Sequence, residues 1–135
     1  MPPSPWDNQD MLARGDRVPH FEVRTLDGAR LRYSDVWQRR NLVLIVLAEP
    51  DLPAARQYAA DVAGRLEGFE NTIYALTDER LPALQGTNVL VADRWGEIYF
   101  AAEAAGVAAL PTPDDLADWL LHVGHECPEC QGEAR

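Results

Sequence analysis

Leu42-Val43-Leu44-Ile45-Val46-Leu47-Ala48, residues 42–48, is a stretch that is apolar at every position and partly β-branched. A half-buried strand alternates polar and apolar side chains, whereas a strand covered on both faces reads as a continuous apolar run of this length. The run is broken directly afterwards by Glu49-Pro50-Asp51. We therefore predict a fully buried strand at the centre of a sheet, with helices on each side of it.

A helix and a second strand are predicted after this run. From Pro53 onward, apolar residues recur at spacings of three and four, as on the buried face of a helix, at Ala55, Tyr58, Ala59, Val62 and Leu66. Residues 72–76, Thr-Ile-Tyr-Ala-Leu, then read as a strand. Strand, helix and strand in this order predict a parallel βαβ unit, which is normally right-handed.

A hairpin is predicted before the run. Residues 20–23, His-Phe-Glu-Val, alternate polar and apolar side chains, and Leu26-Asp27-Gly28 supplies a turn. Residues 31–33 then continue an antiparallel return strand. Ser34 is positioned to cap a single helical turn that follows the strand. The ordered part of the chain is thus expected to begin with an N-terminal β-hairpin.

Two further strands and a last helix complete the predicted domain. Residues 89–92 and 97–100 are joined by the short turn 93–96, which forces antiparallel pairing. Thr112 is expected to cap the last helix and Gly124 to end it. The predicted fold class is α/β, with a mixed central sheet, helices on both faces and an N-terminal β-hairpin.

Composition restricts the class of protein and its partners. The chain has 135 residues, enough for one domain, and a formal net charge of -10 from 22 acidic against 12 basic residues. A surface of this sign repels nucleic-acid phosphates and anionic membranes, so we expect neither as a partner. No segment approaches the roughly 18 apolar residues of a membrane helix, and none reads as a secretory signal. We therefore expect a cytoplasmic location.

Three segments are expected along the chain. Residues 1–12 are rich in proline and polar residues and are interpreted as a flexible N-terminal lead-in. Residues 13–124 hold all the predicted strands and helices. Residues 125–135 form a tail that carries Cys127 and Cys130, the only two cysteines. A disulfide between them would close a loop too short to constrain the unfolded chain much, so the core must hold the domain together.

Several local strings add to this order of elements. They are Gly15-Asp16-Arg17-Val18-Pro19-His20-Phe21, Thr25-Leu26-Asp27-Gly28, Leu31-x-x-Ser34-Asp35-x-Trp37, Asn41-Leu42-Val43-Leu44-Ile45-Val46 and Asp93-Arg94-Trp95-Gly96-Glu97-Ile98. Together they resemble the redoxin branch of the thioredoxin-like superfamily. That branch includes alkyl hydroperoxide reductase/thiol-specific antioxidant proteins and thiol-disulfide oxidoreductases. The resemblance covers about residues 14 to 123 and implies a thioredoxin-like fold.

The resemblance also implies where a redox site would lie and that this chain lacks it. In the oxidoreductases the central strand leads to Cys-Pro-x-Cys-Arg, where the N-terminus of a helix stabilises a thiolate. The matching string is Leu52-Pro53-Ala54-Ala55-Arg56, so Leu52 and Ala55 stand at the cysteine positions while Pro53 and Arg56 are kept. Thr87 matches the cis-proline of the oxidoreductases, which is a threonine or arginine in the peroxidases. Because the peroxidases place their reactive cysteine in the same region, the usual peroxiredoxin activity is not expected.

The C-terminal string His122-Val123-Gly124-His125-Glu126-Cys127-Pro128-Glu129-Cys130 leaves three interpretations open. Cys127 and Cys130 have the spacing of a catalytic redox dithiol, but they follow a helix and stand among glutamates, both of which raise the pKa of a thiol. With His122 and His125 they would make a Cys2His2 zinc set. The third interpretation is an exposed, unreactive tail.

We therefore expect a redoxin-like domain without the usual peroxidatic or dithiol site, acting as a non-catalytic binding or redox-associated protein. Its partner is an unidentified protein or thiol compound, and a homodimer is compatible with the sequence. One alternative is a thiol-disulfide oxidoreductase or antioxidant protein that uses Cys127 and Cys130. The other is a zinc-binding module of His122, His125, Cys127 and Cys130. No cofactor is expected apart from zinc in that last case, and whether the chain is an enzyme stays open.

Overall fold

The computed structural model describes residues 15–79 and 86–126, and in this part of the chain a four-stranded sheet has the order β4-β3-β5-β6. β3 (Asn41–Val46) pairs in parallel with β4 (Thr72–Thr77) and antiparallel with β5 (Thr87–Ala92). β6 (Ile98–Ala104) pairs antiparallel with β5 at the edge. The apolar run is therefore the buried central strand that its composition predicts.

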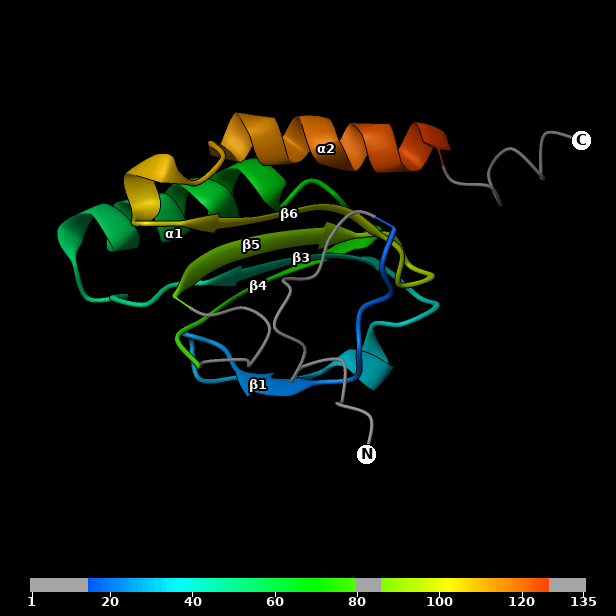
Figure 1. Ribbon diagram of the computed structural model, residues 1–135, viewed down its shortest axis with the longest axis horizontal. Helices are drawn as coiled ribbons and strands as arrows, with labels where there is room; N and C mark the ends of the chain where they lie inside the picture. The colour runs from blue at the N-terminus through cyan, green and yellow to red at the C-terminus, as the bar shows by residue number, and fades with distance from the viewer. Residues whose placement is uncertain (1–14, 80–85, 127–135) are drawn as a thin grey trace, which may run out of the picture.

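One face of the sheet is covered by both α-helices. α1 (Pro53–Leu66) and α2 (Pro113–Glu126) lie side by side above the sheet in Figure 1. Val43, Ile45 and Leu47, every second residue of the central run, are buried in the core on this side. α1 has the bounds that its apolar spacing predicts, and its buried residues include Tyr58, Val62 and Leu66.

The other face is covered by the N-terminal hairpin, β1 (Glu22–Arg24) and β2 (Arg30–Arg32), and by the 3-10 helix η2 (Tyr33–Asp35), below the sheet in Figure 1. The even-numbered residues 42, 44 and 46 of the central run are buried in this second core. The predicted fold class is confirmed. In the described part of the chain, however, the helix on this second face is only a 3-10 turn, because the hairpin supplies the remaining apolar cover.

Tyr33 ends the hairpin earlier than predicted. Its ring stacks on that of Phe21, with centroids 5.3 Å apart, and is buried. The backbone N–H of Val36 donates to the Tyr33 carbonyl oxygen at 2.9 Å, which closes a 3-10 turn. Ser34 lies inside this turn, and the N-cap is Arg32, which makes no side-chain capping bond. The prediction that Ser34 caps the turn is therefore wrong.

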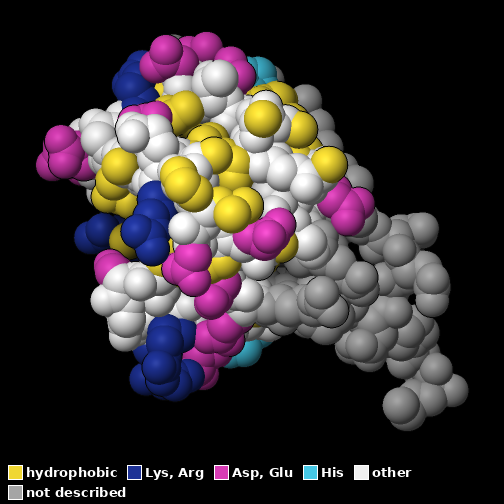
Figure 2. Space-filling view, turned by 90° about the vertical axis from the view of Figure 1, so that its left-hand side faces the viewer, with side chains coloured by type: hydrophobic (Ala, Val, Ile, Leu, Met, Phe, Trp, Pro, Cys, Tyr) yellow, Lys and Arg dark blue, Asp and Glu magenta, His cyan; other side chains and the backbone are white. Residues whose placement is uncertain are grey.

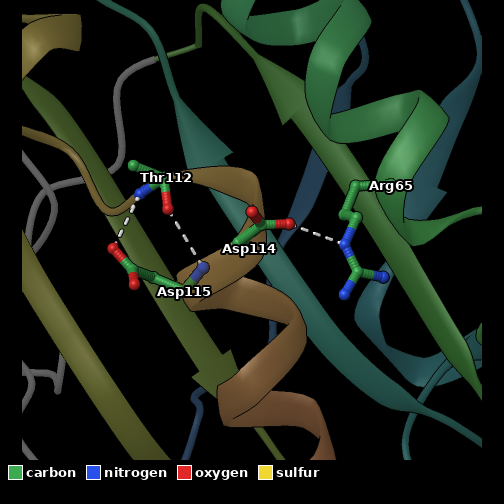
Figure 3. A network of polar contacts seen from close by, with 4 residues as sticks. All are labelled: Arg65, Thr112, Asp114 and Asp115. Carbon is green, nitrogen blue, oxygen red and sulfur yellow. Dashed lines mark hydrogen bonds and ion pairs between the residues drawn. The ribbon is translucent and has the colours of Figure 1, made fainter.

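The start of α2 is capped and is tied to α1 (Figure 3). The backbone N–H of Asp115 donates to Thr112 Oγ1 at 3.1 Å, and the backbone N–H of Thr112 donates to Asp115 Oδ2 at 3.1 Å. This reciprocal pair satisfies two N–H groups at the helix start and confirms the predicted Thr112 cap. Beside it, Arg65 Nε of α1 donates to Asp114 Oδ1 at 2.8 Å.

The end of α2 differs from the prediction. Gly124 lies inside the helix, which continues to Glu126. A glycine within a helix costs only about 1 kcal/mol relative to alanine. Leu120 and Val123 are buried just before it, and this burial holds the last turns against the sheet. Gly124 is therefore not the stop residue of α2.

A second tie joins α1 to the loop before α2. Tyr58 Oη donates to the Pro111 carbonyl oxygen at 2.7 Å, and the Tyr58 side chain is buried. The 3-10 helix η3 (Val107–Ala109) precedes this loop and also contacts α1. Burial raises the pKa of Tyr58 to about 12, and the carboxylate of Asp115 adds to the shift. The Tyr58 hydroxyl is therefore a hydrogen-bond donor throughout the neutral range.

Tyr58→Phe should lower the free energy of unfolding by about 1 kcal/mol at neutral pH, because the bond to the Pro111 carbonyl is lost. Folded protein keeps Tyr58 protonated up to about pH 12, whereas the unfolded group ionises near 10.0. Stabilisation by the neutral hydroxyl is thus complete below pH 10 and is lost as the pH rises towards 12. Urea unfolding at several pH values should show the gap between wild type and variant narrowing over this range. A constant gap contradicts the role given to Tyr58.

Candidate functional site

The loop after β3 meets the start of β5 at one end of the sheet. The two strands are antiparallel, with Val46 opposite Asn88. The backbone N–H of Ala48 donates to Thr87 Oγ1 at 3.3 Å, and Thr87 is buried. The structure therefore brings Thr87 against the loop that leads to α1.

Leu52 is the N-cap residue of α1, with φ -64° and ψ 143°. Leucine has no polar side-chain atom, so it makes no capping hydrogen bond, and Pro53 follows at the start of the helix. The Leu52 carbonyl oxygen accepts the backbone N–H of Arg56 at 3.0 Å, which is the first bond of the helix. The helix end thus offers backbone N–H groups that its N-cap side chain leaves unbonded, an arrangement that favours negative charge.

Ala55 and Arg56, the other two matched residues of α1, differ in exposure. Ala55 is only 1% exposed and belongs to the core between the helices and the sheet. Arg56 is exposed, with its guanidinium 3.9 Å from the Asp51 carboxylate, a surface pair of small energetic value. Of the five residues matched to the family site, only Thr87 carries a hydroxyl, and that oxygen already accepts the Ala48 N–H.

Apolar side chains gather on the face of the molecule where α1 begins (Figure 2). Leu52 is 49% exposed there, and Pro53 and Ala54 beside it are also exposed. η3, which contacts α1, adds the exposed Ala108 and Ala109. We call these five residues the apolar end. It occupies the place at which the family resemblance predicts a redox site.

Sequence reasoning finds the α1 part of the apolar end but misses the contribution of η3. A signal is present, since residues 107–110, Val-Ala-Ala-Leu, form an apolar string between a strand and a capped helix. So short a string has no periodicity that reveals which face it buries. Its contact with α1 is a property of the tertiary structure.

The C-terminal candidates lie only partly within the described residues. His122 is half-buried on α2, with its ring edge-on to Trp119 at 5.6 Å between centroids. The side chain of His125 and the whole of Cys127 and Cys130 lie outside the described residues, so the redox pair and the zinc set stay predictions. Within the described ranges, no three His, Cys, Asp or Glu side chains group as a metal site.

The three-dimensional structure of the chain is similar to solved structures of other proteins. No protein-family model matches the sequence, and no curated protein is significantly similar to it. A peroxiredoxin-like protein from Aquifex aeolicus is 14% identical, with a TM-score of 0.65 over 84% of this chain and 88% of that one. A thiol peroxidase from Chromobacterium violaceum is 9% identical, with a TM-score of 0.62 over 87% and 91%. A thiol:disulfide interchange protein of the thioredoxin family from Chlorobium tepidum TLS is 12% identical, with a TM-score of 0.58 over 82% and 97%.

These likenesses establish a thioredoxin-like fold, which the resemblance of the sequence motifs implies. Each match covers at least 82% of this chain, so it spans the domain rather than one βαβ unit. At sequence identities of 9–14%, these matches show a shared fold and do not show a shared function. Function has to be argued from the residues at the site.

A cysteine placed at the N-cap of α1 should be acidic. In a chain carrying Cys127→Ser and Cys130→Ser, we expect Leu52→Cys to give a thiol whose pKa lies about 1 unit or more below 8.5, because the helix N-terminus stabilises the thiolate. Leu121→Cys is the control, since Leu121 is 52% exposed but lies in the second half of α2. The pH dependence of alkylation by iodoacetamide measures both values. Equal values in the two variants contradict the helix-end argument.

Proposed function

We propose that the chain is a redoxin-fold binding protein without thiol catalysis at the family site, and that its apolar end contacts a partner protein. The observation that carries the proposal is Leu52. At the N-cap of α1, where the resemblance predicts a reactive sulfur, an apolar side chain stands 49% exposed. A leucine neither attacks a peroxide nor exchanges with a disulfide, but it gains free energy when another protein buries it.

The described part of the chain contains no sulfur, which supports a non-catalytic role for the family site. Residues 12–126 contain neither cysteine nor methionine. Peroxide reduction and disulfide exchange both need a thiolate nucleophile. The hydroxyl of Thr87 does not replace it, because Thr87 is buried and its oxygen accepts the Ala48 N–H.

The apolar end has the properties of a contact surface. Apolar patches rimmed by polar groups are typical of sites where soluble proteins bind one another. Glu49, Asp51 and Arg56 are exposed and lie within four positions of Leu52 in the sequence, so we expect them to supply such a rim. Full burial of a leucine side chain contributes about 1.5–3 kcal/mol relative to full exposure, so half-exposed Leu52 offers part of this.

Charge narrows the class of partner. The net charge of -10 disfavours nucleic acid and anionic membrane surfaces. In the described part of the chain, no helix combines the length and the apolar character that crossing a membrane requires. A cytoplasmic protein or a second copy of this chain is the partner that fits an apolar surface on an acidic domain.

The alternatives at the C-terminal pair rest on the sequence alone, which argues against a reactive thiol there. The described part of α2 ends at Glu126, and Cys127 is the next residue in the sequence. The negative end of the helix dipole and the Glu126 carboxylate both oppose formation of a thiolate there. The His122 ring packs edge-on against Trp119. A zinc site that includes His122 therefore has to form beside Trp119. We keep both alternatives as outcomes of the assays.

Activity assays on the full chain separate these roles. The proposal expects consumption of hydrogen peroxide and reduction of a disulfide substrate by dithiothreitol to stay at background rates. It also expects no stoichiometric zinc in protein purified without chelator. Turnover that Cys127→Ser abolishes would replace the proposal with the oxidoreductase alternative. Zinc that Cys130→Ser releases would replace it with the zinc module.

Paired leucine variants test the contact surface. Leu52→Asp and Leu121→Asp each add one charge at a leucine of similar exposure, 49% and 52%. Sedimentation measures self-association, and cross-linking with mass spectrometry measures contact with other proteins. We expect association by wild type and Leu121→Asp, and association at least about tenfold weaker for Leu52→Asp, because a charge replaces a buried apolar contact. Equal association of all three, or none by any, contradicts the proposal.

A further inference from the structure

A second candidate site lies at the opposite end of the sheet from the apolar end. β3 begins where β5 ends, with Leu42 opposite Ala92, so the segments before β3 and after β5 come together there. Together with residues from the start of the domain they line an open pocket of about 580 Å³. Its lining residues are drawn from three separate segments and include Arg17, His20, Tyr33, Trp37, Trp95 and Gly96.

Trp37 and Trp95 both line the pocket, and hydrogen bonds of the Trp37 indole and of the Trp95 carbonyl oxygen join the segments that carry them. Trp37 is 46% exposed, and its Nε1–H donates to the Trp95 carbonyl oxygen at 3.3 Å. Arg17 also donates to that oxygen, at 2.7 Å. The guanidinium of Arg94 lies 5.4 Å from the centroid of the Trp95 ring. A large exposed indole that is fixed in this way offers a flat apolar surface to a ligand ring.

Gly96 keeps the inner part of the pocket free of side chain. Its φ of +86° lies in the left-handed region, which favours glycine. A Cβ at this position would lie 2.9 Å from Tyr33 Oη and 3.6 Å from Trp37 Cδ1. The glycine therefore preserves space between the Tyr33 hydroxyl and the wall formed by Trp37.

Among the described residues, the Tyr33 hydroxyl has no hydrogen-bond acceptor. Tyr33 is 5% exposed, and among the described residues its Oη has no hydrogen-bond partner. Burial raises the pKa of Tyr33 to about 12, the Asp93 carboxylate adds to the shift, and the Arg17 guanidinium opposes it. The hydroxyl therefore keeps its proton at neutral pH. A buried hydroxyl that makes no bond costs free energy, so an acceptor on a ligand would relieve that cost.

The charge of the lining favours an anion. Arg17 supplies a positive charge to it, and no described residue of the lining is a carboxylate, although the chain as a whole has a net charge of -10. The neighbouring Asp93 is buried, and its Oδ1 accepts the backbone N–H groups of Trp95 and Glu97 at 2.9 Å each. These two bonds stabilise the carboxylate, which is not among the side chains that line the pocket.

We infer that this pocket binds a small planar aromatic carboxylate. The aromatic ring stacks on Trp37 and Trp95, and the carboxylate accepts hydrogen bonds from the Tyr33 hydroxyl and meets the positive charge of Arg17. A volume of about 580 Å³ suits one such molecule. The pocket shares no residue with the apolar end. Its ligand can therefore be tested separately from the proposed function.

A second pocket on the same domain supplies an internal control. It has a volume of about 690 Å³ between β6 and α2, and Phe100 and Trp119 in its lining stack at 5.2 Å between ring centroids. Asp115 and Asp118 also line it. This pocket has aromatic surface but carries carboxylates, so an aromatic anion should avoid it.

Titration of the full chain with 1-naphthoate and with 1-naphthylmethylammonium tests the inference, since the two probes share a ring and differ in charge. Nuclear magnetic resonance of the indole N–H groups reports which tryptophan is contacted. We expect 1-naphthoate to shift the Trp37 and Trp95 signals with a dissociation constant below about 1 mM, and the ammonium probe to bind at least about tenfold more weakly there. Equal binding of both probes, or shifts confined to Trp119, would overturn the inference.

Three variants locate the binding groups. Tyr33→Phe should weaken 1-naphthoate binding about fivefold while leaving the fold as stable as wild type or more so, because it removes only an unbonded hydroxyl. Trp37→Ala should weaken it about tenfold by removing the stacking surface. Trp119→Ala is the matched control and should leave the affinity unchanged. An unchanged affinity of Tyr33→Phe or of Trp37→Ala for 1-naphthoate would overturn the inferred binding mode.

Discussion

Every side chain of β3 from Leu42 to Val46 is buried, and successive side chains of a strand point to opposite faces, so two separate layers have to cover this one strand. The two α-helices form one layer, and the hairpin with η2 forms the other. The remaining geometry depends on this double cover. It fixes where α1 begins, because the chain has to turn back over the sheet directly after β3. It also fixes η2 beneath β3, which places Tyr33 and Trp37 beside the turn between β5 and β6.

Much of this arrangement is predictable from the sequence because the responsible signals are local. The unbroken apolar run predicts β3, spacings of three and four predict α1, and the Thr112 hydroxyl predicts the start of α2. Features that depend on contacts with residues far away in the sequence are predicted less well. Tyr33 looks like part of a strand until its stacking on Phe21 is known, and Gly124 looks like a helix stop until the burial of its neighbours is known.

The same distinction applies to the two candidate sites. The family resemblance locates the apolar end through Leu52 and Thr87, which the structure brings to one end of the sheet, but exposure of Leu52 beside η3 is a tertiary property. The aromatic pocket escapes sequence reasoning altogether. Trp37 and Trp95 are far apart in the chain and each looks like a residue of the core or its rim. Only the antiparallel pairing of β3 with β5 brings them together, at the end opposite the apolar end.

The central position of β3 has a consequence for the folding of the newly made chain. Both strands that pair with β3 follow it in the sequence, and β4 is separated from it by the whole of α1. Strand pairings between distant segments make folding slower than in helical bundles, whose contacts are mostly local. The chain loses conformational entropy when the loop closes, before the hydrogen bonds and packing of the paired strands offset that loss. Until both partner strands have been synthesised, residues 42–48 remain an uncovered, uncharged and β-prone segment. The residues that organise the native domain are thus also those most prone to aggregation while it is being made.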